Sequence, residues 1–454
     1  MNTADAYYKK MTETPVSQLI IKLGIPTTIS MLVTSIYNMA DTYFVGSLGE
    51  SPQAATGILF TLQAIIQALS FMLGQGSGTL VSKSLAEKNI HEASQYVSTA
   101  FFTGAAAGAV LMVLGLVFLD PLLYILGSTD TILPYARDYG MWVLIACPFM
   151  VCSFVLNNNL RYEGKAFFAM IGLVTGGLIN IFGDWLLIGV FEMGVFGAGL
   201  STAASQFISF TILLVAHFRM AQGSIHPKYI SRKLKMYLSI MKIGFPALIR
   251  QGLTSISNGL LNNLTKPFGD AAIAAMSVVG RYSMLVMCVG LGIGQGFQPV
   301  ASFNYQAKKY LRVKKGLLFT MGVGFVLVLI MALPGLIIPE FIVSLFQENS
   351  QVQQIGGFAL RCASIGVLFL PLSIPVNMLY QSIRKAGVSS FLSMIRSGLM
   401  LIPTLLITTH FFQLTGIQIS QPIADIGTGL ISIPFIIHFL VKTPNTDFEE
   451  KTKA

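Results

Sequence analysis

The chain is a succession of apolar stretches of about 20 residues, separated by short segments rich in charge, proline and glycine. A helix of that length spans a bilayer, and the stretches show too little alternation to be barrel strands. We therefore predict an all-α polytopic membrane protein with about twelve transmembrane helices. The predicted spans begin near Val16, Ala54, Val97, Thr131, Gly164, Val195, Tyr237, Ala271, Gly316, Val352, Val388 and Ile417.

Composition also indicates lipid as the main solvent. Only 11% of the 454 residues are charged and 54% are hydrophobic, whereas an ordinary soluble domain has roughly 25% charged residues. The net charge is +10, but the cations lie in short loops between apolar stretches. We therefore expect the lipid bilayer, and not nucleic acid, as the large partner. The four cysteines lie inside apolar stretches without CxxC spacing, and we interpret them as core residues.

Lysine and arginine collect in alternate loops, which predicts the orientation of the chain. The longest basic segment runs from Arg219 to Lys242, while the opposite loops carry acids, Glu348 among them. Because cytoplasmic loops hold the excess of cations, we expect a multi-pass protein of the inner (plasma) membrane with both termini in the cytoplasm. Lys451 and Lys453 near the C-terminus agree with this orientation. Residues 1–15 are polar and the next apolar stretch is too long for a signal peptide, so we expect the first span to be retained.

The sequence repeats itself at an offset of 220 residues. Lys22–Pro26 (KLGIP) matches Lys242–Pro246 (KIGFP), and Gly74–Gly76 (GQG) matches Gly294–Gly296 (GQG). Chance matches do not keep one register over more than sixty residues, so the halves are copies. With three residues inserted, further pairs align: Pro148 with Pro371, Arg161 with Arg384 and Gly164 with Gly387.

The repeat predicts the domain organisation. We expect an N-terminal six-helix lobe at residues 1–218, a cytoplasmic inter-lobe linker at 219–242 and a C-terminal six-helix lobe at 243–454. Since six is an even number, both copies enter the membrane from the same side and are parallel repeats. Such duplications are typical of secondary transporters. A duplication kept only for packing is the alternative.

Two acids of the first half lie within apolar spans, where a charge costs about 2.5–3.5 kcal/mol. Asn180 precedes Asp184 by four residues, so a helix places both on one face, and Thr202 and Gln206 have the same spacing. Buried carboxylates that approach each other are suitable proton carriers, and the same oxygens suit Na⁺. We predict a cation-coupling site at Asp41, Asp184, Asn180 and Thr202. The coupling ion is H⁺ or Na⁺, and a Na⁺ ion would bind at Asp41, Asp184 and Asn180. The alternative for Asp41 is a helix-end residue that faces water.

The second half lacks these acids. Leu261 at offset 220 and Ile407 at offset 223 correspond to Asp41 and Asp184. Two copies of one architecture thus carry ionisable groups at these positions in only the first copy. We therefore expect the coupling site inside the N-terminal lobe.

The second half instead has two arginines in its first two spans, Arg250 and Arg281, and one acid, Asp425, in its last. We expect an ion pair within the bundle between Asp425 and one of these arginines. Snorkelling to the membrane surface and contact with substrate are the alternatives, and Arg281 is a candidate cavity residue.

Aromatic and amide side chains near the acids predict a substrate cavity. Tyr37 and Phe182 offer ring faces, which attract organic cations, and Gln206 offers an amide. Pro26 removes a backbone hydrogen bond from the first span and predicts a hinge, with a cap at the helix entry as the alternative.

Glycine-rich segments are a separate question. Gly290–Gly296 (GLGIGQG) looks superficially like a nucleotide loop, but no Lys-Ser/Thr follows it and it lies inside a span. We interpret this segment, and the pair Gly172 and Gly176, as surfaces for close helix packing.

Several segments carry a resemblance to the MATE (multidrug and toxic compound extrusion) family of transporters, and within it to the bacterial DinF-like and MepA-like branch. The second half echoes the first, so that the resemblance covers nearly the whole chain. The matching segments are Gly24–Pro26 (GIP), Asp41–Gly46 (DTYFVG), Gly74–Gly78 (GQGSG), Arg161–Gly164 (RYEG), Asn180–Asp184 (NIFGD) and Gly197–Gln206 (GAGLSTAASQ).

The resemblance implies two six-helix lobes, cation-driven antiport and export of mostly cationic, amphipathic compounds. It makes Asp41 and Asp184 the acids of the N-terminal lobe, Asn180 and Thr202 their polar companions, and Pro26 the proline where the first helix bends. The C-lobe acids of the NorM-like branch are not evident here, which favours H⁺, or H⁺ and Na⁺, in the first lobe. We expect a monomeric multidrug efflux antiporter that confers antibiotic resistance, without enzymatic activity or cofactor.

Two other functions compete with this one. A related flippase for lipid-linked oligosaccharides needs several cations for phosphates, and only Arg250, Arg281 and Arg396 are available. An intramembrane prenyl or acyl transferase needs clustered acids or a His/Asp set, and the five histidines are scattered over loops and ends. The sequence also lacks the GxxxxGK[ST] loop of an ATP-driven pump.

Overall fold

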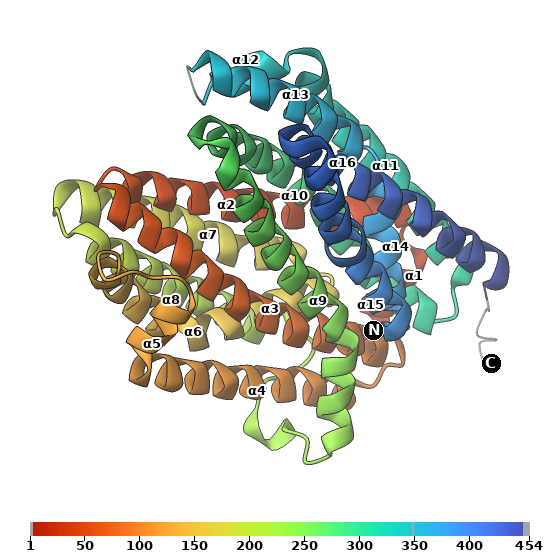
Figure 1. The fold of residues 1–454 in the computed structure, drawn as a ribbon. Coiled ribbons are helices and arrows are strands. Elements are labelled where there is room, and N and C mark those ends of the chain that lie inside the picture. The colour runs from red at the N-terminus through yellow and green to blue at the C-terminus, as the bar shows by residue number, and fades with distance from the viewer. Residues whose placement is uncertain (1–2, 347–348, 448–454) are drawn as a thin grey trace, which may run out of the picture. The chain divides into compact units, whose positions relative to one another are not determined.

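The structure is a computed structural model that describes residues 3–346 and 349–447 (Figure 1). Glu348, Lys451 and Lys453, used above for the orientation, lie outside these residues. The described part is helical, with one isolated bridge between Lys309 and Asp447. The helices are α1 (Thr3–Glu13), α2 (Val16–Gly46), α3 (Glu50–Ala86), α4 (Ile90–Val117), α5 (Leu119–Ile125), α6 (Leu133–Tyr162), α7 (Ala166–Asp184), η1 (Trp185–Val190), α8 (Gly194–Met220), η2 (Pro227–Tyr229), α9 (Leu234–Thr265), η3 (Lys266–Phe268), α10 (Asp270–Gln306), α11 (Tyr310–Ile337), α12 (Pro339–Ser344), α13 (Ser350–Val367), α14 (Leu370–Ser382), α15 (Ala386–Met394), η4 (Ile395–Met400) and α16 (Leu401–Lys442).

Length and hydropathy identify most of the membrane spans. Within the described residues, nine helices are long and apolar enough to cross a membrane, and the pair α13 and α14, bent by 47°, makes a tenth. Helix α9 has 32 residues, or about 48 Å at 1.5 Å per residue. It is therefore long enough to be the eleventh.

Helix α16 and the segment before it are two spans and not one. Gln413 has a left-handed φ of 51° inside α16. Nε of Arg396 lies 2.7 Å from Oδ1 of Asp425, whereas a straight helix would separate residues 29 positions apart by about 43 Å. The chain therefore turns back near Gln413. Length and hydropathy identify nine or ten spans among the described residues, and the addition of α9 and the division near Gln413 bring the total to the twelve that the sequence predicts.

The chain forms two compact units. One consists of Ile29–Gln251, and the other of Met1–Thr28 together with Gly252–Ala454. Helices α2 and α9, the first span of each repeat, contribute residues to both units. The chain passes from one unit to the other between Thr28 and Ile29, two residues after Pro26.

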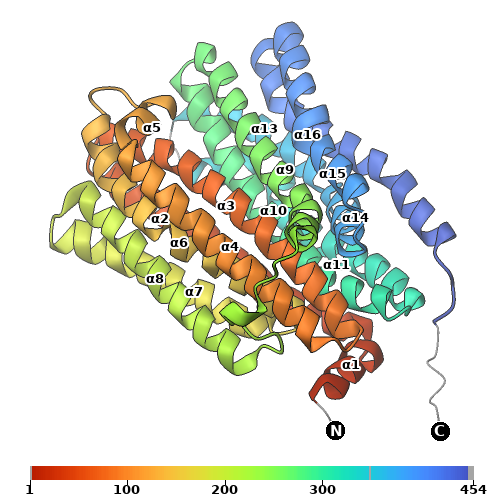
Figure 2. The ribbon, with the colours of Figure 1, turned by 90° about the horizontal axis from the view of Figure 1, so that it is seen from below.

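In the unit Ile29–Gln251, α6 is the central helix and packs against α3, α4 and α8 (Figures 1 and 2). Small residues allow this packing. Gly172 and Gly176 of α7 face Leu213 and Ser209 of α8, where an added Cβ would clash. The interpretation of this glycine pair as a packing surface is confirmed.

In the other unit, α10 packs against α11, α13 and α14. The glycines of Gly290–Gly296 let the first part of α2 approach α10. A Cβ at Gly296 would meet the backbone of Gly24, and one at Gly292 would meet Thr28. The interpretation of this segment as a packing surface is therefore also confirmed.

The two copies keep the 220-residue offset further than the sequence alignment suggested. Nδ2 of Asn157 donates to the carbonyl of Ala169 at 3.0 Å, and Nδ2 of Asn377 donates to that of Ser389 at 2.9 Å. Left-handed φ angles recur at this offset as well: Lys88 with Lys308, and Gly164 with Arg384.

The three-residue insertion expected around Arg384 and Gly387 is therefore wrong. Identical residue types suggested it, but the backbone turns at Gly164 and Arg384 occupy equivalent places. At an offset of 220 the residue that corresponds to Asp184 is then Thr404 and not Ile407. If the π-helix η4, which precedes it, adds one residue to the helix, the corresponding residue is Leu405. Neither is ionisable, so the asymmetry between the copies is kept.

Candidate cation-coupling site

Four helices of the unit Ile29–Gln251 bring polar side chains together. Asp41 comes from α2, Tyr139 from α6, Asn180 and Asp184 from α7, and Thr202 from α8. The four-residue spacing on α7 places Asn180 and Asp184 on one face, as the sequence indicated. Both side chains are buried, with exposed fractions of 2% and 0%.

A chain of hydrogen bonds links these helices. The Tyr139 hydroxyl donates to Oδ2 of Asp41 at 2.7 Å and lies 3.3 Å from Oγ1 of Thr202. Nδ2 of Asn180 donates to Oγ1 of Thr202 at 3.3 Å and to Oγ of Ser201 at 3.4 Å. The Ser201 hydroxyl in turn donates to the main-chain carbonyl of Asn180 at 3.0 Å. Asp41 is thus connected to Asn180 through two hydroxyl groups.

Four buried oxygens at this site accept no hydrogen bond of ordinary geometry from the described residues, although the Ser201 side chain interacts with the Asp184 carboxylate. They are both carboxylate oxygens of Asp184, Oδ1 of Asp41 and Oδ1 of Asn180. A buried acceptor without a donor costs about 1–3 kcal/mol, and more when charged. The carboxylates of Asp41 and Asp184 also interact electrostatically, and two negative charges at these positions repel each other. This set of oxygens therefore favours a bound proton or a hard cation, for which carboxylate and amide oxygens are suitable ligands.

The other side of the site is more accessible. Asp41, Tyr37 and Gln206 are only partly buried, and the Gln206 side chain hydrogen-bonds to Tyr37. Tyr37 is one helical turn before Asp41 on α2. The site therefore has a buried inner part at Asn180 and Asp184 and a more open outer part at Tyr37, Asp41 and Gln206.

Other candidate residues lie elsewhere. Phe182 is 58% exposed and packs against Trp185 with ring centroids 5.6 Å apart. Two residues from either Asn180 or Asp184 on the same helix, it points away from them. Arg281 is exposed and belongs to the other unit, as does Pro26, which lies well inside α2 and not at its entry.

The ion pair expected at Asp425 has a different partner. Asp425 pairs with Arg396 and accepts two hydrogen bonds from Nε2 of Gln421, at 3.1 and 3.2 Å. The expectation of Arg250 or Arg281 as the partner is therefore wrong. The reason is the turn near Gln413, which brings η4 beside α16. Arg250 instead donates to Oε1 of Gln75 at 3.5 Å.

The sequence did not identify Tyr139 or Ser201. Tyr139 is only 2% exposed, and a buried phenol requires a hydrogen-bond partner. The presence of a tyrosine within an apolar span was therefore the one feature of the sequence that could have pointed to Tyr139. Within the described residues, no group of three or more His, Cys, Asp or Glu side chains is placed to hold a metal ion.

Comparisons with known proteins agree with one another. The MatE family model matches residues 26–186 and 246–407. The multidrug export protein MepA of Staphylococcus aureus (strain MSSA476) is 26% identical over 449 residues, which is 98% of each chain.

Two solved structures are similar in fold. One, described as MATE in complex with MaL6, has a TM-score of 0.91 at 22% identity and covers 98% of this chain and 100% of its own. The other, a MOP superfamily transporter from Pyrococcus furiosus, is described as having a binding pocket of reverse polarity that suggests a different function. Its TM-score is 0.88 at 22% identity, over 95% and 98% of the two chains.

Proposed function

Because this chain belongs to the MatE family, a family of multi-pass membrane transporters, we propose that it exports organic cations in exchange for H⁺ or Na⁺. The curated relative named above is called a multidrug export protein, which supports a broad substrate range. We further propose that the protein is a monomer in the inner membrane with both termini in the cytoplasm. Its two lobes would have the bounds that the sequence repeat predicts, residues 1–218 and 243–454, with a linker at 219–242.

The observation that carries this proposal is the group of four buried oxygens at Asp41, Asn180 and Asp184 that accept no hydrogen bond of ordinary geometry. Three of them belong to the inner part of the site and Oδ1 of Asp41 lies at its border with the outer part, and this is where a proton or Na⁺ binds in our proposal. Thr202 and Tyr139 hold Asn180 and Asp41 in place through hydrogen bonds. Occupation of the inner part by a cation removes the cost of leaving these acceptors unpaired.

The outer part of the site supports the choice of substrate. Asp41 supplies negative charge and Tyr37 an aromatic ring, both partly accessible. Such a pair attracts an organic cation with aromatic surface. Arg396, one of three cations that a phosphate-binding flippase would use, is paired with Asp425, which leaves fewer charges for that function.

Coupling requires a movable element, and we propose α2 for this role. Pro26 cannot donate to the carbonyl of Lys22, so the helix is weakened there. The change of unit between Thr28 and Ile29 is close to that point. Cation binding at Asp41 changes the charge on the same helix, which links the site to the weakened turn.

The test is dye export by the purified full-length protein in liposomes, with ethidium as the dye and either a pH gradient or a Na⁺ gradient imposed. Asp184→Asn keeps the shape and removes the ionisable group, so it should abolish export that is driven by the coupling ion. Asp138→Asn, an exposed acid of α6, is the matched control and should export as the wild type does. Gradient-driven export by Asp184→Asn at the wild-type rate would exclude Asp184 from coupling. Indifference of the wild type to ethidium, together with movement of anionic lipid-linked sugars, would favour the flippase.

A further inference from the structure

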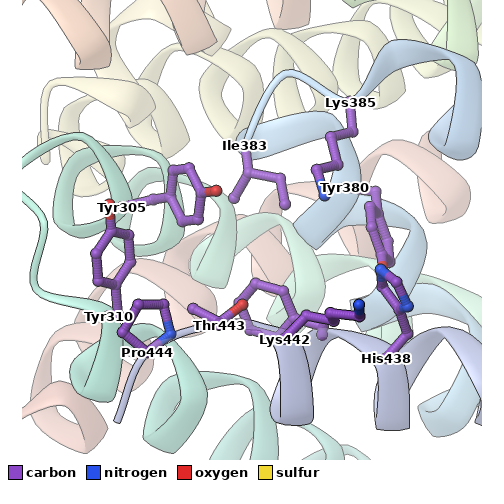
Figure 3. Close-up of a pocket in the computed structure, with 10 residues that line it drawn as sticks. Tyr305, Tyr310, Tyr380, Ile383, Lys385, His438, Lys442, Thr443 and Pro444 are labelled. Carbon is purple, nitrogen blue, oxygen red and sulfur yellow. The ribbon is translucent and has the colours of Figure 1, made fainter. Parts of the chain in front are cut away.

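A small pocket lies where several spans of the second repeat end. It is formed by the end of α10, the start of α11, the connection between α14 and α15 and the end of α16, and Figure 3 shows its side chains. Its volume is about 140 Å³. Its lining residues include Tyr305, Tyr310, Tyr380, Ile383, Lys385 and Lys442.

The electrostatic character of this pocket is positive. No acid is among its lining residues. Lys385 and Lys442 are exposed and have no carboxylate partner in the described part of the chain, and Nζ of Lys385 lies 5.9 Å from the centroid of the Tyr380 ring. The pocket therefore presents two ammonium groups, with aromatic rings around them.

One helix end at the pocket strengthens this character. Lys385 is the N-cap of α15, whose N-terminus has no side-chain cap. The N-terminus of α11, which begins at Tyr310, already has an anion, because Oδ1 of Asp447 accepts from the Leu311 amide at 2.8 Å. Helix N-termini favour negative charge. The opposing end, the C-terminus of α16, is covered by Nζ of Lys314, which donates to the carbonyls of Leu440 and Thr443 at 2.6 Å each.

The first repeat shows that the fold does not require this chemistry. The turn is the same in both copies, because the Lys385 amide donates to the Tyr380 carbonyl at 2.9 Å and the Lys165 amide to that of Leu160 at 2.8 Å. At the positions of the three tyrosines, however, the first repeat has Leu85, Ile90 and Leu160. It also has Glu163 in place of Ile383, and Gln222 in place of Lys442. The three tyrosines and Lys442 are thus features of the second copy alone, whereas Lys385 has a lysine counterpart in Lys165.

Size and position restrict the ligand. About 140 Å³ is well below the roughly 300 Å³ at which sites for drug-sized molecules begin, but it is several times the ~30 Å³ that a water molecule occupies. Beside the pocket, Ile437 and Val441 of α16 are 55% and 75% exposed. A phosphate group fits the pocket, while a chain attached to it can lie along this aliphatic surface.

We propose that the pocket binds the phosphodiester headgroup of an anionic phospholipid, with Lys385 and Lys442 on the phosphate and the tyrosines at the membrane interface. Basic pockets between membrane helices bind such headgroups, and tyrosine is enriched at the interface. This site is separate from the coupling site and does not depend on the proposed transport function.

The experiment uses the full-length protein in nanodiscs of phosphatidylcholine, with or without phosphatidylglycerol, followed by native mass spectrometry of the retained lipid. The wild type should retain phosphatidylglycerol in preference to phosphatidylcholine. Lys385→Gln/Lys442→Gln should lose roughly tenfold of that preference, because each Lys near an anionic headgroup adds attraction. Lys385→Arg/Lys442→Arg keeps both charges and should restore it.

The matched control is Lys165→Gln/Lys233→Gln, which removes two charges from the first repeat and its linker and should leave retention unchanged. Equal losses in the two double variants would mean a general charge effect and would overturn the site. Full retention by Lys385→Gln/Lys442→Gln would overturn it as well. In a further arm, inorganic phosphate is added in excess; displacement of phosphatidylglycerol at millimolar phosphate would show a free-phosphate site and contradict the lipid.

Discussion

Tyr139 and Asp41, 98 residues apart in sequence, are joined by a hydrogen bond of 2.7 Å in which the phenol donates to the carboxylate. The bond holds Asp41, the less buried of the two acids of the site, against α6. The other oxygen of Asp41 is left without a donor in the described structure. Tyr139 therefore decides which oxygen of Asp41 is available to a cation.

Removal of this donor should impair transport without unfolding the protein. Tyr139→Phe keeps the ring, and a hydrogen bond to a charged group contributes about 1.5–3 kcal/mol. We expect the rate of dye export in liposomes to fall about tenfold or more at unchanged expression. Tyr43→Phe, at a tyrosine that is 75% exposed, is the control and should have no effect. Unimpaired export by Tyr139→Phe would mean that this bond has no part in coupling.

Substrate and proton should compete for the site. Protonation of Asp41 or Asp184 removes the negative charge that attracts an organic cation, and thermodynamic linkage makes the effect reciprocal. We expect the affinity of the wild type for ethidium to decrease as the pH is lowered from about 8 to about 6. Fluorescence titration of the purified protein measures it, and Asp41→Asn/Asp184→Asn should bind weakly at every pH. An affinity of the wild type that is constant over this range would contradict exchange of protons for substrate.

The sequence predicted the spans, the repeat and the inner residues of the site, because each leaves a local signal. Asn180 and Asp184 are one helical turn apart between apolar residues, and such a polar pair in a span has few explanations. Tyr139 left no comparable signal. Its role depends on the packing of α6 between α2 and α8, which joins segments that are distant in sequence.

The errors have the same origin. Arg396 and Asp425 are partners because the chain turns back near Gln413, between the spans predicted from Val388 and from Ile417. The sequence predicted this turn, but not which side chains of the two spans face each other. The insertion placed near Arg384 came from matching residue types. The positive φ at Gly164 and Arg384 shows that the backbone is kept where the side chain changes, which sequence identity alone does not reveal.

The Arg396–Asp425 pair should be a sensitive point for stability. Asp425 is 2% exposed and the Arg396 side chain 18%. Removal of a partner from a buried pair typically costs about 3–5 kcal/mol, and the partial exposure of Arg396 places Asp425→Asn at or below the lower end of that range. Asp425→Asn should therefore lower the Tm of the detergent-purified protein by several degrees. Thermal unfolding followed by size-exclusion chromatography is the measurement.

The double variant Arg396→Met/Asp425→Leu separates the pair from its parts. It removes both charges and fills the space with apolar groups, so it should recover most of the lost Tm. A Tm of the double variant as low as that of Asp425→Asn would mean that the hydrogen-bond geometry of the pair, and not its balance of charge, holds η4 against α16.

Glu163 holds the segment after α8 in place. It lies between α6 and α7, is fully buried, and accepts from the backbone amides of Gln222 at 2.5 Å and Gly223 at 3.4 Å. The carbonyl of Gly223 lies 2.9 Å from Nε2 of His217. Burial raises the pKa of the Glu163 carboxyl from 4.5 to about 7, against the opposing effects of the two amides and of Lys165.

This pKa predicts how stability depends on pH. Since the pKa is higher in the folded protein, the folded state binds the proton more tightly than the unfolded state. The contribution of Glu163 to the free energy of unfolding should therefore be fully present below pH 4.5 and fall by up to about 3 kcal/mol as the pH rises to about 7. Glu163→Gln removes this contribution, so its Tm relative to the wild type should increase between pH 4.5 and 7 and stay level above. Glu192→Gln, at an exposed residue, serves as the control with a constant difference. A constant difference for Glu163→Gln as well would mean that Glu163 does not change its protonation on unfolding in this range.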